Sequence, residues 1–132
     1  MAKFQRDQML DTALSAVREN VKIITVCSGQ PMTFDQALTQ KSGGTGFMLA
    51  KTNTSAASFA ALQNGDASGR KLTVNAHSGI TVSATGGGNH VALLSSAAAS
   101  TLWYVTTAAS QVLTAGNALT INAWDIEIAD AT

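Results

Sequence analysis

The chain has 132 residues, a formal net charge of zero, 45% hydrophobic residues and only 12% charged residues. That length suits a single domain with a core of its own. A neutral and weakly charged chain has no general attraction to nucleic acid or to an anionic membrane surface, so we expect direct contact with neither.

The few charges are unevenly placed along the chain. Residues 1–71 hold all eight basic groups against five acids, a balance of +3, whereas residues 72–132 hold only Asp125, Glu127 and Asp130, a balance of −3. The first 53 positions of that second half carry no Lys, Arg, Asp or Glu. The oppositely charged halves could pair within one subunit or between neighbouring subunits, and the sequence leaves both arrangements open.

The chain begins MAKFQRDQ, which is charged and has no long apolar block, and no apolar run approaches the ~20 residues of a membrane-spanning helix. We therefore predict a protein made in the cytoplasm, without a membrane anchor. Cys27 is the only cysteine, so an internal disulfide is excluded. Its place in the apolar run VKIITVC predicts a small buried side chain.

The N-terminal part predicts two helices and a strand. Apolar residues at helical spacing predict a first helix within residues 1–20, with Leu10 and Leu14 on its apolar face. That face could pack on the protein's own sheet or on a neighbouring subunit. The β-branched run Lys22–Cys27 predicts a strand. A short second helix is expected over Thr33–Leu38, capped by the side chain of its first residue.

Turns and loops divide the middle of the chain. The glycine-rich segment 41–46 (KSGGTG) is expected to be a flexible loop, followed by a strand over 47–51. The segment Asn64–Gly69 (NGDASG) is dense in turn-forming residues and leads into the next strand. The glycines 86–88 are expected to form another loop.

Apolar and polar residues alternate over 72–76 and again over 80–84. This pattern predicts a β-hairpin that reverses at His77–Gly79, with one apolar face and one polar face. Val91–Leu94 and Leu102–Thr107 are apolar at both parities, which predicts strands covered on both faces.

The last strand changes phase along its length. Leu119 and Ile121 are apolar at odd positions, whereas Trp124, Ile126 and Ile128 are apolar at even positions. A β-bulge would produce this change, and so would a strand that crosses from one sheet to another. Both explanations remain open.

About seven short strands separated by turns predict a mainly β fold, a β-sandwich or jelly-roll-like barrel, with an N-terminal α-helix. We expect one domain over 1–132, with the helix in 1–20 and a β-rich body over 21–132. Soluble proteins usually protect sheet edges with Lys, Pro or inward-pointing charges, and the C-terminal half has almost none of these. Partners that cover its faces and edges are therefore expected.

The motifs that could carry chemistry are weak. Asn64–Gly69 resembles the first half of a calcium loop, but the twelfth position would be Asn75 rather than Glu, so a tight turn is expected. The glycines 86–88 lack the Lys-Ser/Thr pair and the helix of a phosphate loop. His77 and His90 have no GxSxG motif to complete a hydrolase site, and with one cysteine they make a poor zinc site. We predict a protein that is not an enzyme, with no catalytic, cofactor-binding or metal-binding residues.

Trp103, Tyr104 and Trp124 could form a sugar-binding platform, because aromatic rings stack on sugars and carry polar groups. Their apolar neighbours favour packing in a core or an interface instead. Asn53-Thr54-Ser55 fits the pattern of an N-glycosylation acceptor, which has no meaning in a cytoplasmic protein.

Four segments resemble a group of small phage and prophage proteins that are structural components of virions. They are 65–82 (GDASGRKLTVNAHSGITV), 90–94 (HVALL), 102–107 (LWYVTT) and 110–130 (SQVLTAGNALTINAWDIEIAD). The resemblance covers roughly residues 60–130 of this chain. It implies a capsid cement or decoration protein, or a tail or fibre component, and it brings no functional residues with it.

We therefore predict a bacteriophage virion structural protein, preferably a capsid cement or decoration protein that stabilises the shell by protein–protein contacts. The predicted partners are other virion proteins, first among them the major capsid protein, and further copies of the chain in a homo-oligomer. The predicted location is the virion. The alternatives are a tail or fibre component and a carbohydrate-binding module that stacks its sugar on Trp103 or Trp124.

Two further predictions concern contacts between subunits. The isolated protein is expected to self-associate through its uncharged β half. Residues 1–20 and the loop 41–46 are expected to contact other subunits, because basic groups concentrate there while the chain ends in acids. These basic groups are Lys3, Arg6, Arg18 and Lys41.

Overall fold

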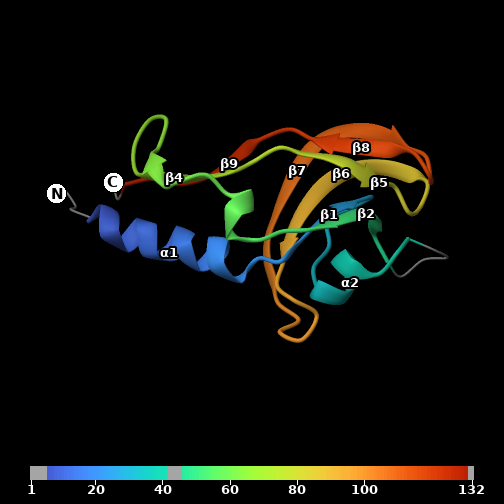
Figure 1. Ribbon diagram of the computed structural model, residues 1–132, viewed down its shortest axis with the longest axis horizontal. Helices are drawn as coiled ribbons and strands as arrows, with labels where there is room; N and C mark the ends of the chain where they lie inside the picture. The colour runs from blue at the N-terminus through green and yellow to red at the C-terminus, as the bar shows by residue number, and fades with distance from the viewer. Residues whose placement is uncertain (1–5, 42–45, 131–132) are drawn as a thin grey trace.

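The computed structural model describes residues 6–41 and 46–130, and the chain folds mainly into antiparallel β-sheet with an N-terminal helix (Figure 1). The elements in chain order are α1 (Asp7–Asn20), β1 (Ile23–Cys27), α2 (Phe34–Leu38), β2 (Met48–Asn53), the 3₁₀ turn η1 (Ala56–Ser58), β3 (Gln63–Asn64), β4 (Arg70–Val74), β5 (His77–Thr81), β6 (Gly86–Leu94), β7 (Leu102–Leu113), β8 (Ala118–Ile121) and β9 (Trp124–Ile128). The predicted fold class, mainly β and sandwich-like with an N-terminal helix, is confirmed. Residues 1–5 of the predicted first helix and 42–45 of the predicted loop lie outside the described residues.

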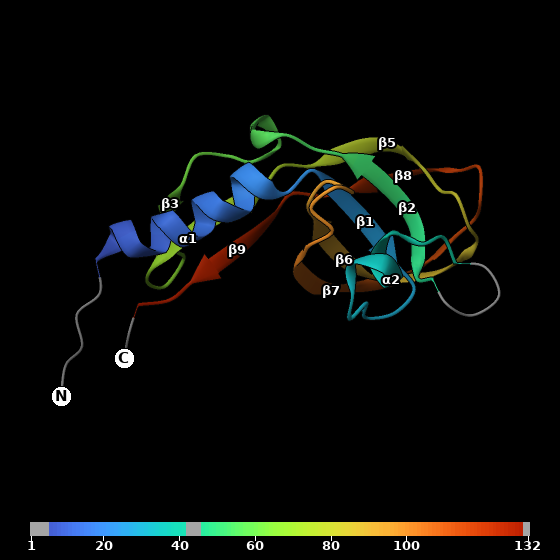
Figure 2. The same cartoon turned by 90° about the horizontal axis from the view of Figure 1, so that it is seen from below.

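The strands form three sheets, with the orders β2-β1-β6-β7, β3-β4-β9 and β5-β8. The four-stranded sheet and the β5-β8 pair make up a wide body, while α1, β4 and β9 form an arm that extends from it (Figure 1). Figure 2 shows the same division from below. Apolar side chains from β1, β2, β5, β7 and β8 pack together and join the two sheets of the body, so the body is sandwich-like.

The body is closed on one side and open on the other. On the closed side, Ala50 of β2 bridges Val82, and the Leu49 carbonyl accepts hydrogen bonds from the N–H groups of Ser83 (2.7 Å) and Ala84 (3.2 Å). Leu49 is the extra residue of a β-bulge opposite β1, which leaves its carbonyl free for this link. On the other side, within 6–41 and 46–130, β7 pairs only with β6 and β8 only with β5. The outer edges of β7 and β8 are therefore unpaired there.

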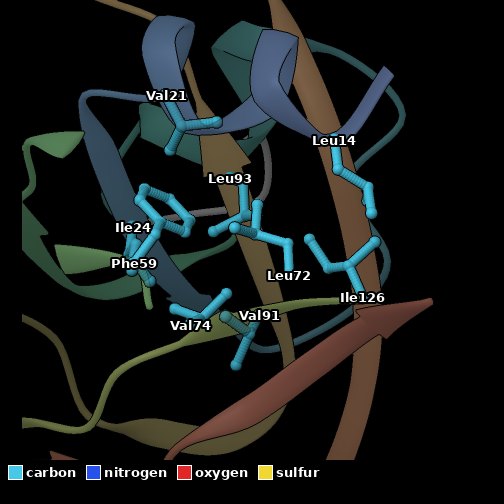
Figure 3. Packing of buried hydrophobic residues seen from close by; sticks show 9 residues of the cluster. All are labelled: Leu14, Val21, Ile24, Phe59, Leu72, Val74, Val91, Leu93 and Ile126. Carbon is cyan, nitrogen blue, oxygen red and sulfur yellow. The ribbon is translucent and has the colours of Figure 1, made fainter. Parts of the chain in front are cut away.

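Helix α1 packs its apolar face on the protein's own strands. Leu10 and Leu14 are buried, and Leu14 points toward Leu72 of β4 and Ile126 of β9 (Figure 3). The buried cluster around them contains Leu14, Val21, Ile24, Phe59, Leu72, Val74, Val91, Leu93 and Ile126. It therefore joins the arm to β1 and β6 of the body.

Three local predictions in the first 70 residues are confirmed. The Thr33 hydroxyl accepts a hydrogen bond from the Gln36 N–H at 3.1 Å and caps α2. Cys27 is fully buried, and burial raises the pKa of its thiol. The turn 64–69 is closed by a hydrogen bond from the Gly65 N–H to the Gly69 carbonyl at 2.9 Å.

The predicted hairpin is wrong. Strands β4 and β5 do not pair with each other, because β4 pairs with β9 and β5 pairs with β8. The β4–β5 path and the β8–β9 path thus run side by side as one long antiparallel ribbon. The pairs Val74↔Trp124 and His77↔Ile121 are three residues apart on both paths, so the register is kept across the interruption.

The segment His77–Gly79 is a β-bulge rather than a turn. From His77 to Ile80, β5 advances three residues, while β8 advances two, from Ile121 to Leu119. Gly79 has a φ of +68°, in the left-handed region that glycine adopts without strain. The glycine that looked like a chain reversal therefore sits inside a strand, where it accommodates one extra residue.

The predicted phase change in the last strand is confirmed, and it is a crossing between sheets. The ladder stops at Asn122 and Ala123, between β8 of the two-stranded sheet and β9 of the three-stranded sheet. On the facing path, residues 75–76 interrupt the ladder at the same level. At this level the side chains of both paths exchange the faces of the ribbon on which they lie. On β5, the extra residue of the Gly79 bulge shifts the alternation back by one position, so the sequence of that path shows no phase change.

Two predictions about β6 and β7 are corrected. Val91–Leu94 of β6 are buried as predicted, but Leu102–Thr107 of β7 are half-buried or exposed, and Tyr104 is 37% exposed. The reason is that β7 is an edge strand. The glycines 86–88 are not a loop but the start of β6. A Cβ at Gly88 would lie 3.0 Å from side-chain atoms of Val26 in β1 and Leu113 in β7, so a larger residue here would require these neighbours to shift.

Candidate functional site

A cleft of about 390 Å³ lies on the open side of the body, between β7 and the β8–β9 path. Small-molecule sites usually measure about 300–1,000 Å³. Apolar side chains of the interior form part of the lining: Val26, Val91 and Leu113. Hydroxyl, amide and carboxylate groups come from the two bordering segments: Thr106, Thr107, Gln111, Thr120, Asn122 and Asp125. The cleft thus combines an apolar interior with polar borders.

The β7 border of the cleft is a bulge of two residues. From Gln111 to Thr107, β7 advances four residues, while β6 advances two, from Gly88 to His90. The additional residues fall within 108–110, which are exposed and uncharged. A bulge of this kind disrupts the ladder and re-aims side chains. It also explains how this long edge limits edge-to-edge pairing without a charged residue.

The opposite border is the crossing between β8 and β9. Asn122 and Ala123 belong to no ladder there, and both are exposed. Trp124 and Asp125 follow directly, at the start of β9. The crossing therefore gathers an amide, an indole and a carboxylate within four consecutive residues at the edge of the cleft.

The structure separates the three aromatic residues of the predicted platform. Trp124 lines the cleft, and Trp103 is not part of the lining. Tyr104 stacks on Trp124, with ring centroids 5.9 Å apart and an interplanar angle of 27°. The Nε1 atoms of both tryptophans are buried without a hydrogen-bond partner in the described part of the chain. Packing, rather than hydrogen bonding, therefore orients the Trp124 ring.

Opposite charges of the two halves meet within one subunit. Lys71 Nζ lies 2.7 Å from Asp66 Oδ1 and 3.4 Å from Asp125 Oδ2. Nearby, Arg70 Nε lies 2.7 Å from Asp11 Oδ1 and ties β4 to α1. The hydrogen bond to Asp66 raises the pKa of Lys71, and the hydrogen bond to Asp11 raises the pKa of Arg70.

The loop that resembles half a calcium site does bring acids together. Asp66, Asp125 and Glu127 have carboxylate oxygens within 4.8 Å of one another, the one such group of three found among residues 6–41 and 46–130. Lys71 already supplies positive charge to Asp66 and Asp125. Glu127 Oε1 accepts a hydrogen bond from the Asp66 N–H at 2.9 Å. These contacts account for the cluster as a link between the turn, β4 and β9.

The two histidines do not form a site together. His77 lies in β5 and His90 in β6. His90 Nδ1 is 2.7 Å from Asn89 Oδ1, whereas His77 Nδ1 is buried and has no partner among the described residues. Neither belongs to the acidic group of three.

Comparison with protein-family models, with curated proteins and with solved structures found no match to this chain. In the described part of the chain, neither helix has the length and apolar character needed to cross a membrane.

Sequence reasoning identified Trp124 but missed its polar neighbours in the cleft. Gln111, Thr120 and Asn122 are ordinary polar residues of a Thr/Ser/Asn-rich chain, and no periodic pattern distinguishes them. The one signal that marked their position was the phase change between Ala123 and Trp124.

Proposed function

We propose that this chain is a structural protein of a bacteriophage particle, and that its role is capsid cement or decoration. In this role it acts through protein–protein contacts and not through catalysis. The resemblance of residues 60–130 to small phage and prophage virion proteins supports the class. One observation of the fold supports it independently: the exposed surface of the body contributed by residues 72–124 carries no formal charge.

This uncharged surface consists of the exposed part of β7, 108–112, and the loops at the two ends of that strand, 96–101 and 114–118. Val112, near the C-terminal end of β7, is a large apolar side chain that is 81% exposed. The cores of protein interfaces are depleted of charged residues, because neutral groups cost less to remove from water. A surface of this kind suits a lasting contact with a neighbouring protein.

The bulge in β7 indicates how the contact is made. An edge interrupted at 108–110 is a poor template for a continuous added strand. The contact therefore uses side chains of the uncharged surface more than its main-chain hydrogen bonds. The proposed partners are the major capsid protein and further copies of this chain, and the rival placement is in the tail or a fibre.

The test is incorporation of single-residue variants into particles of the phage that encodes the chain. Val112→Asp places a charge in the uncharged surface, while the matched control Met32→Asp places the same charge on another apolar side chain, which is 72% exposed. We expect both variants to fold, and we expect only Val112→Asp to be lost from purified particles, as measured by mass spectrometry.

Equal incorporation of the two variants would remove the uncharged surface from the proposal. Absence of the wild-type chain from purified particles would overturn the proposal as a whole. A reconstruction of the native particle then separates the two placements, since density for the chain on the shell supports cement and density on the tail supports the rival.

A further inference from the structure

We propose that the cleft between β7 and the β8–β9 path binds a neutral glycan. In this proposal Trp124 provides the stacking surface, and Asn122 and Gln111 provide hydrogen bonds. The inference goes beyond the proposed function. It depends on the cleft alone and is independent of where in a particle the chain resides.

The aromatic part of the cleft has the chemistry that sugar recognition requires. The Trp124 side chain is partly buried and lines the cleft, so part of the indole remains open to a ligand. Its ring is held by the stacking contact with Tyr104 at 5.9 Å. A large, oriented aromatic surface can pack against the C–H face of a sugar ring without first losing conformational freedom.

The polar part of the cleft is suited to hydroxyl groups. Asn122 and Gln111 offer planar amides, which donate and accept side by side, and they stand on opposite borders of the cleft. The Asp125 carboxylate is held by hydrogen bonds from Thr73 Oγ1 and Lys71 Nζ. These contacts engage the carboxylate within the arm, so the two amides carry the hydrogen bonding to a ligand hydroxyl.

The charge of the lining selects the class of glycan. The lining contains one carboxylate and no basic side chain. The carboxylate of an acidic sugar would lose its hydration without gaining a cation in the lining, since the nearby Lys71 already pairs with Asp125. Neutral saccharides meet no such cost, and they use both the apolar and the hydrogen-bonding groups.

The backbone of both borders favours a glycan over an added peptide strand. An added strand needs a regular ladder on at least one side. The β7 border is bulged by two residues at 108–110, and the opposite border leaves its ladder at Asn122 and Ala123. Irregular backbone at both borders presents side chains to the cleft instead of an even row of N–H and C=O groups.

The test is calorimetric titration of the full chain with cellohexaose, maltohexaose and chitohexaose. We expect at least one of these neutral probes to bind. Asn122→Ala should weaken that binding about five- to tenfold, the effect of one lost hydrogen bond. The matched control Asn117→Ala removes an exposed amide outside the cleft and should leave binding unchanged.

Tryptophan fluorescence then locates the ligand. Binding should change the emission of the wild type and of Trp103→Phe, and it should leave the emission of Trp124→Phe unchanged. Failure of all three probes at millimolar concentration would overturn the proposal, as would equal weakening by Asn122→Ala and Asn117→Ala. A particle reconstruction with a peptide segment in the cleft would also overturn it, by assigning the cleft to a protein partner.

Discussion

Leu14 shows how one side chain holds the arm and body together. It is 1% exposed, and it belongs to the cluster that combines α1, β4 and β9 with β1 and β6. Met9 on the same helix is 64% exposed. Substitutions at these two positions therefore distinguish the contribution of helix packing from that of intrinsic helix stability.

Leu14→Ala should lower the free energy of unfolding by about 2–5 kcal/mol, because it leaves a cavity where α1 meets β4 and β9. Met9→Ala should change it by less than about 0.5 kcal/mol, as exposed substitutions usually do. Chemical denaturation followed by circular dichroism measures both. Equal stability of the two variants would show that α1 does not pack on this sheet.

Cys27 makes the stability of the protein vary with pH in the alkaline range. Burial raises the pKa of its thiol above the ordinary value of 9.0. The folded state keeps a proton that the unfolded chain releases, so the free energy of unfolding should fall as the pH rises from 9.0 toward the folded pKa. Below pH 9.0 the thiol is protonated in both states, and its full contribution to the free energy of unfolding is present.

Denaturant titrations between neutral pH and pH ~11 test this prediction by comparing the wild type with Cys27→Ala. The cavity left by the substitution lowers stability equally at every pH, whereas removal of the thiol removes its part of the alkaline decline. The difference between the two curves should therefore shrink as the pH rises. Parallel curves would contradict the prediction.

The ribbon formed by β4–β5 and β8–β9 depends on a bulge and a crossing. Gly79, with φ +68°, has open space around the position of a Cβ, so an added methyl group meets no atom within 4 Å. Gly87 in β6 has the same open space, but its φ lies outside the left-handed region. This pair of glycines isolates the cost of backbone conformation from that of steric contact.

Gly79→Ala should lower the free energy of unfolding by about 1–2 kcal/mol, the cost of a left-handed conformation for a residue with a Cβ. Gly87→Ala should leave it unchanged or raise it by up to about 1 kcal/mol, because the unfolded chain loses freedom. Thermal denaturation of both variants tests this difference. An unchanged melting temperature for Gly79→Ala would mean that the bulge can take another backbone conformation.

Local signals in the sequence predicted individual elements well, and long-range pairing poorly. The Thr33 cap, the helical face of Leu10 and Leu14, and the turn 64–69 each depend on neighbouring residues and were all predicted correctly. The partners of β4 and β5 depend on residues some 40 to 60 positions away. The apolar–polar alternation over 72–84 fits a hairpin and a ribbon equally. The interruption at 75–76 and the bulge at Gly79 each shift the alternation by one position, and the two shifts cancel.

The candidate site was predictable in part, for the same reason. The phase change before Trp124 marked the crossing, since only the β8–β9 path lacks a compensating bulge. The two-residue bulge at 108–110 leaves no trace in the pattern, because that stretch of β7 is small and polar throughout. The cleft exists because of these two irregularities together, and only the structure shows that they face one another.

The molecule as a whole separates the ion pairs of its described residues from its uncharged surface. The ion pairs Arg70–Asp11 and Lys71–Asp125 lie in the arm, where β4 and β9 meet α1 and each other. The body presents the uncharged segments 96–101, 108–112 and 114–118. Salt should therefore affect the arm, and it should have little effect on contacts made by these uncharged segments.

The isolated protein should self-associate through the uncharged surface at micromolar concentration. Sedimentation velocity over a range of concentrations measures this, and Val112→Asp should shift the distribution toward the monomer while Met32→Asp should not. High salt should leave the association intact, because few charges take part. A wild-type protein that remains monomeric at every concentration would contradict the prediction.

Residues 118–128 provide the partner of β4 and the partner of β5. Ala118 pairs with Thr81, 37 positions earlier, and Ile128 pairs with Arg70, 58 positions earlier. During synthesis the ribbon cannot form until this segment has left the ribosome, and pairing over such distances is slow. Until then the apolar side of α1 and several charge-poor strands lack their cover and can aggregate. The yield of soluble protein should therefore depend on growth temperature and chaperone supply more than on the stability of the finished fold.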